Sequence, residues 1–88
     1  MIIIDQNKEG CFWFGPGNCV TIEEDGPDLG TWFIVARKVG EGRGGRYVLG
    51  EYATLEYAKD VLNDIAGDAA HDSKLFYMPK DRIVMEGK

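Results

Sequence analysis

Alternating apolar and polar positions predict strands over most of the first 52 residues. Residues 1–5 read MIIID, which is short and β-branched, and a turn-like QNKEG separates them from the aromatic run CFWF at 11–14. The next four residues, GPGN at 15–18, predict a turn, because a proline between two glycines does not continue a strand ladder. From Cys19 to Glu23 apolar and polar residues alternate, as in a strand with one covered face.

The strongest strand pattern is TWFIVARK at 31–38, in which both alternating sets are apolar. Trp32 and Ile34 belong to one set, and Phe33 and Val35 form the other. A strand that is apolar on two faces needs cover on both of them.

A weaker version of this pattern is RYVLGEY at 46–52. It predicts Tyr47 and Leu49 on one face of a strand and Val48 and Tyr52 on the other. The two strands are predicted to pair as a central antiparallel hairpin.

The period changes after this strand, in ATLEYAKDVLNDIAGD. Apolar residues recur at threes and fours from Leu55 to Ala69, which predicts an amphipathic helix. Thr54 is the predicted N-cap and Gly67 a left-handed stop, so the helix is placed at 54–67.

The remaining segment, KLFYMP, predicts a short strand at 74–79, and the tail at 80–88 is ambiguous and expected to fray. The chain is therefore expected to be a single α+β domain over 1–88. Its predicted architecture is a rolled antiparallel sheet, a partial barrel of about five to six strands, with one amphipathic helix in the C-terminal half.

One helix shields only one side of a sheet, so the second apolar face of 31–38 needs another cover. Either the sheet rolls into a partial barrel or a second copy of the protein packs on it, and we expect some of both. The candidate self-association residues are Trp32, Ile34 and Tyr47, and a homodimer is the expected partner state.

A literal G-x-G-x-x-G occurs at Gly40, Gly42 and Gly45. In a dinucleotide-binding motif these glycines lead into a helix whose N-terminus holds the pyrophosphate. Here the next predicted element is the strand at 46–52, so the glycine-rich segment is interpreted as a hairpin loop.

The formal charge of −5 argues against general attraction to nucleic acid or to an anionic membrane. The stretch 37–46 is an exception, because it carries four basic residues against a single Glu41. Its candidate contacts for an anion or a partner are Arg37, Lys38, Arg43 and Arg46.

Cys11 and Cys19 have neither redox nor zinc-ligand spacing and are interpreted as small buried thiols. The single histidine, His71, lies in a polar stretch without converging partners and is interpreted as a solvated loop residue. No catalytic residue, metal site or cofactor is predicted. With no secretory signal and no apolar run near the roughly 20 residues of a membrane span, a cytoplasmic location is expected.

Three stretches resemble a group of small uncharacterised proteins of low-GC Gram-positive bacteria and their phages: MIIIDQNKEG, RYVLGEYATLEYAKDVLNDI and KLFYMP. This chain departs from the group by its glycine-rich insertion at 40–45 and by GPG at 15–17. The resemblance implies a shared fold and a phage-related origin, and it brings no catalytic residues with it.

Two functions remain open. The leading expectation is a non-enzymatic, prophage-derived domain that acts through protein binding and self-association. The alternative is a nucleic-acid binding module that uses the basic hairpin at 37–46.

Overall fold

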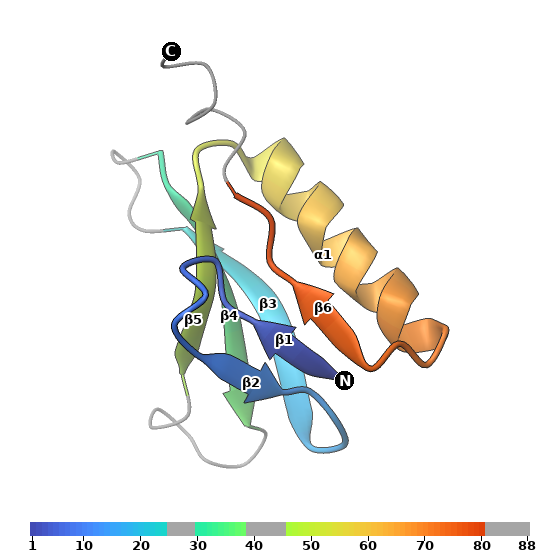
Figure 1. Cartoon of the computed structure of the whole chain (residues 1–88). Coiled ribbons are helices and arrows are strands. Elements are labelled where there is room, and N and C mark those ends of the chain that lie inside the picture. Colours follow the sequence, from blue (N-terminus) through green and yellow to red (C-terminus); the bar gives the residue numbers. More distant parts are fainter. Residues whose placement is uncertain (25–29, 39–45, 81–88) are drawn as a thin grey trace.

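A computed structural model describes residues 1–24, 30–38 and 46–80, and within these residues the chain forms six strands and one helix. The elements are β1 (Ile2–Ile4), β2 (Cys11–Trp13), β3 (Asn18–Glu24), β4 (Trp32–Lys38), β5 (Tyr47–Tyr52), α1 (Leu55–Ala70) and β6 (Leu75–Tyr77). Figure 1 shows α1 lying along one side of the strands. The predicted α+β class, the number of strands and the single helix are confirmed.

The strands form two sheets that do not close into a barrel. The small sheet has the order β2-β1-β6, and the meander has the order β3-β4-β5. All pairs are antiparallel except β1 with β6, which run parallel. The expected single rolled sheet is thus divided, because β1 pairs with the distant β6 instead of joining the meander.

The turn between β2 and β3 is the one that GPGN predicts. The backbone N–H of Asn18 donates to the carbonyl of Gly15 at 3.1 Å, and Gly17 has φ 86°. Proline in the second position and a left-handed glycine in the third are typical of a type II turn.

A β-bulge interrupts β5. Ile34 of β4 pairs with Gly50, whereas the next residue, Val35, pairs with Val48, so Leu49 is an extra residue. The predicted placement of Tyr52 opposite the Leu49 face is therefore wrong. The bulge shifts the alternation of side chains by one position. Leu49 and Tyr52 therefore both belong to the same core, where each is 1% exposed.

The helix begins where the sequence predicts and ends later. Thr54 is the N-cap, and its side chain accepts a hydrogen bond from the backbone N–H of Tyr57 at 3.2 Å. Gly67 lies within the helix and does not stop it, so the predicted end is wrong by three residues.

The helix stops instead in a Schellman arrangement built on Asp72. This residue has φ 60°, which aspartate tolerates better than most residues. The backbone N–H of Ser73 donates to Asp68 at 3.0 Å, and that of Asp72 donates to Ala69 at 3.2 Å. Both bonds satisfy carbonyls at the end of the last turn.

Side chains from the two sheets and the helix form one hydrophobic core among the described residues. Its fully buried side chains come from β1, β4, β5, α1 and the residue that follows β6, and half-buried side chains from β2, β3 and β6 pack against it. Its buried members are Ile3, Ile34, Ala36, Leu49, Tyr52, Ala58, Val61, Ile65 and Met78.

Gln6 connects the small sheet to the meander. Its backbone N–H donates to the bulged Leu49 carbonyl at 2.8 Å. Its side chain accepts from the N–H of Glu51 at 3.0 Å and donates to the Glu51 and Pro79 carbonyls at 3.1 and 3.2 Å. The side-chain amide of Gln6 therefore makes hydrogen bonds to β5 of the kind that a neighbouring strand would make.

Candidate protein-contact surface

The outer side of the small sheet is apolar across all three strands. Ile3 is fully buried and pairs with Phe12 and Phe76, so these three residues line the core. Their neighbours along each strand point to the opposite side, because side chains alternate in a strand.

These neighbours form two cross-strand rows, which together we call the apolar face. Ile2 pairs with both Trp13 and Leu75, and Ile4 pairs with both Cys11 and Tyr77. The six members are therefore Trp13, Ile2, Leu75, Cys11, Ile4 and Tyr77.

The apolar face is exposed at its corners. Trp13, Leu75 and Tyr77 are 57%, 47% and 59% exposed, and they are the large apolar side chains that stand out from the described part of the chain. Cys11 is exposed too, whereas Ile2 and Ile4 are half-buried between the outer strands. Single exposed apolar residues are ordinary, but a contiguous group indicates a contact surface.

Trp13 is held in place by the turn between β2 and β3. The side-chain amide of Asn18 donates to the Trp13 carbonyl at 2.8 Å. The indole lies against Gly15 so closely that a Cβ atom there would overlap the ring. Glycine at this position therefore leaves room for the largest side chain of the apolar face.

An open hollow of about 690 Å³ extends the surface beyond Trp13. It lies between the turn after β2 and the segment after α1, with Ile2, Phe14 and Pro16 on one side and Asp72 and Lys74 on the other. This hollow thus adjoins the apolar face and reaches toward the end of the helix.

Charges of both signs surround the apolar face. Lys8 and Lys80 line a hollow together with Tyr77. Lys74 and Asp72 line the hollow beside Trp13. Glu9, in the turn between β1 and β2, is also exposed.

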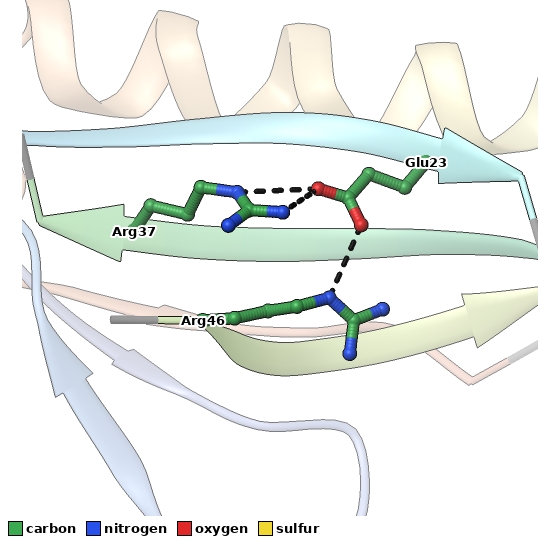
Figure 2. Close-up of polar contacts among 3 residues, drawn as sticks. All are labelled: Glu23, Arg37 and Arg46. Atoms are coloured by element: carbon green, nitrogen blue, oxygen red, sulfur yellow. Dashed lines mark hydrogen bonds and ion pairs between the residues drawn. The ribbon is translucent and has the colours of Figure 1, made fainter. Parts of the chain in front are cut away.

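The other outer surface, on the meander, is closed by an ion-pair network (Figure 2). Glu23 of β3 accepts two hydrogen bonds from the Arg37 guanidinium and one, at 3.1 Å, from Nε of Arg46. The Arg46 guanidinium also lies 5.9 Å from the centre of the Phe33 ring, within cation–π range. At the centre of this surface Val35 is 0% exposed.

The network changes what the basic hairpin offers to a partner. Two of the candidate contacts, Arg37 and Arg46, lie near each other, but the acidic side chain of Glu23 lies between them. The hydrogen bonds from Arg37, followed by the one from Arg46, lower the pKa of Glu23 despite its partial burial. Lys38 is exposed at the end of β4, and Arg43 lies outside the described residues, as does the glycine-rich run at 40–45. The element after that run is a strand, as predicted.

Of the three predicted self-association residues, one is fully buried and two are half-buried within a single chain. Ile34 is 0% exposed, and Trp32 and Tyr47 pack against the core. Tyr47 also donates to Asp5 at 3.0 Å, and its pKa is raised by burial and by this carboxylate. The second face of β4 is covered by the chain's own side chains, so the candidate contact surface is the outer side of the small sheet.

The titratable candidates lie apart. Cys11 is on β2 and Cys19 on β3, and both are free thiols; Cys11 is exposed, so the prediction that it is buried is wrong. His71 is exposed at the C-cap of α1, with Nδ1 2.8 Å from the Gly67 carbonyl. Within residues 1–24, 30–38 and 46–80, no three His, Cys, Asp or Glu side chains are grouped as metal ligands would be.

Sequence reasoning missed the apolar face, although each of its strands was predicted. The missing information is the pairing of β1 with β6, which brings Leu75 and Tyr77 beside Ile2 and Ile4. The one available signal is that KLFYMP alternates, with Leu75 and Tyr77 on the side opposite Phe76.

Searches against protein-family models, curated proteins and solved structures found no match to this chain. No helix among the described residues is long and apolar enough to cross a membrane.

Proposed function

We propose that this chain is a non-enzymatic protein-interaction domain whose contact surface is the apolar face. The observation that carries the proposal is the exposure of Trp13, Leu75 and Tyr77 together on one sheet. Aromatic residues exposed in this way are the usual anchors of protein interfaces.

The placement of the reactive side chains supports a non-enzymatic role. A nucleophile needs a base within hydrogen-bond reach. Cys11 and Cys19 lie on different sheets, and the ring of His71 lies against the Gly67 carbonyl at the end of α1.

Nucleic-acid binding has less support than protein binding. A phosphate that binds the hairpin must compete with the carboxylate of Glu23 for Arg37 and Arg46, because Glu23 forms ion pairs with both guanidinium groups. We therefore keep the apolar face as the functional surface.

We place the protein in the cytoplasm and assign it a prophage origin. The support for the location is that both cysteines are free thiols, as expected in a reducing compartment. The support for the origin is the resemblance of its three sequence stretches to phage-related proteins.

Photo-crosslinking tests the proposal. The photoreactive residue p-benzoylphenylalanine is placed at position 77, where it keeps an aromatic ring on the apolar face, and the chain is expressed in its own host. We expect crosslinks to protein at position 77, and we expect Trp13→Ser to reduce them strongly.

The matched control carries the same residue at position 59, where Lys59 is exposed on α1. It should give few crosslinks. Equal crosslinking at positions 59 and 77, or none at position 77, would contradict the proposal.

A further inference from the structure

We propose that the occupant of the apolar face is a second copy of this chain, packed face to face so that the two small sheets form a sandwich. This inference rests on the proposed function and names its partner. Two sheets that pack in this way lie about 10 Å apart and bury their facing side chains between them.

The exposed area is suited to a weak dimer. Aromatic side chains bury about 150–250 Å² each, so the exposed fractions of Trp13 and Tyr77 leave roughly 90–150 Å² each for contact. With Leu75, the three side chains offer roughly 250–400 Å² per copy, which is the size of the largest patch on a typical monomer. Pairing two copies then buries roughly 500–800 Å² from these residues, and the rest of the face raises it toward the lower limit of about 1,000 Å² for a specific interface.

The shape of the apolar face matches a copy of itself. Its corners are Trp13 and Leu75 in one row and Cys11 and Tyr77 in the other, so the two aromatic rings are diagonally opposed. A twofold axis along β1 sets Trp13 against Leu75 of the partner subunit and Tyr77 against Cys11 of the partner subunit. A twofold axis across the strands also sets each ring against a smaller side chain of the partner subunit. Either axis gives an isologous interface, in which both copies use the same surface.

The charges around the apolar face permit this pairing despite the net charge of −5. Lys8, Lys74, Lys80 and Asp72 line the hollows beside it, and Glu9 is exposed in the turn between β1 and β2. Neither sign of charge dominates. Two copies therefore do not bring like charges together, as they would if the edge of the face carried a single sign, and like-charge repulsion does not oppose the dimer.

Sedimentation equilibrium of the purified chain tests the inference. Between about 10 µM and about 1 mM, the range for a small interface, we expect the average mass to rise from that of one chain toward that of two. Trp13→Ser with Tyr77→Ser should remain monomeric over this range, with an unchanged circular dichroism spectrum. Lys59→Ser, on α1, should associate like the original chain.

The outcomes separate this inference from the function on which it rests. A monomer at every concentration, with Trp13-dependent photo-crosslinks to a different protein at position 77, overturns the second copy as occupant and keeps the interaction domain. A monomer without such crosslinks overturns both. Association that survives the double substitution overturns the assignment of the face.

Discussion

At the residue scale, Glu23 decides how the outer surface of the meander is used. Its carboxylate forms ion pairs with two arginines beside Phe33 and Val35. A polar network therefore covers the face of β4 on which the sequence places these apolar residues. The participating side chains remain partly exposed, at 29% for Glu23, 33% for Arg37 and 42% for Arg46. Solvent therefore screens the ion pairs, and the network contributes modestly to stability.

Glu23→Gln tests this contribution through its pH dependence. The pKa of Glu23 is lowered from 4.5 in the folded chain, so its stabilisation is present above that value and is lost as the pH falls through the lowered folded pKa. Near neutral pH the variant should be less stable by up to about 1 kcal/mol, since exposed pairs contribute little. At acid pH, below the folded pKa, the two proteins should be equally stable.

Urea unfolding at the two pH values measures the difference. A loss of stability that persists unchanged at acid pH would mean that the carboxylate acts through packing rather than charge.

At the scale of elements, local pattern predicted the six strands and the start of the helix. Alternation was sufficient for β3 and β4, and Thr54 marked the start of α1 because N-capping depends on a single residue. The bulge at Leu49 was not predictable, since its carbonyl accepts a hydrogen bond from Gln6, which lies far away in the sequence in the turn after β1. The pairing of β1 with β6 joins the two ends of the described chain, and no local pattern encodes it.

The end of the helix shows the same limit. Glycine is the residue type that most often ends a helix, and Gly67 was predicted to do so. The residue that takes the left-handed backbone conformation is instead Asp72, at the start of the path to β6. The end of a helix depends on the path of the next segment as well as on the residues of its own last turn.

Gly67→Ala distinguishes a glycine inside a helix from one that ends it. No atom lies within 4 Å of a Cβ built at Gly67, and its φ is not in the left-handed region. Alanine should therefore stabilise the protein by about 0.5–1 kcal/mol, through its higher helix propensity.

Chemical denaturation midpoints measure this effect, and Gly17→Ala is the matched control. Gly17 has equally open surroundings but a φ of 86°, so alanine there should destabilise the protein. If Gly67→Ala also destabilises the protein, the helix does not continue through residue 67.

At the scale of the whole molecule, two sheets and a helix enclose one core and leave two outer sheet surfaces. The meander covers its own outer surface with the Glu23 network, whereas the small sheet exposes Trp13, Leu75 and Tyr77. One outer surface is thus covered by charged side chains and the other is not, and both proposals rest on this difference. The surface that remains apolar is the one we assign to protein contact and to the second copy.

The two tryptophans allow the most direct test of this assignment, because Trp13 is on the apolar face and Trp32 packs against the core. Their indole N–H resonances are followed in nitrogen–proton correlation spectra while the chain is diluted from about 1 mM to about 20 µM, the range in which a small interface dissociates. We expect the Trp13 resonance to shift with dilution and the Trp32 resonance to stay in place. A Trp13 resonance that does not move over this range would contradict the assignment of the apolar face to a second copy.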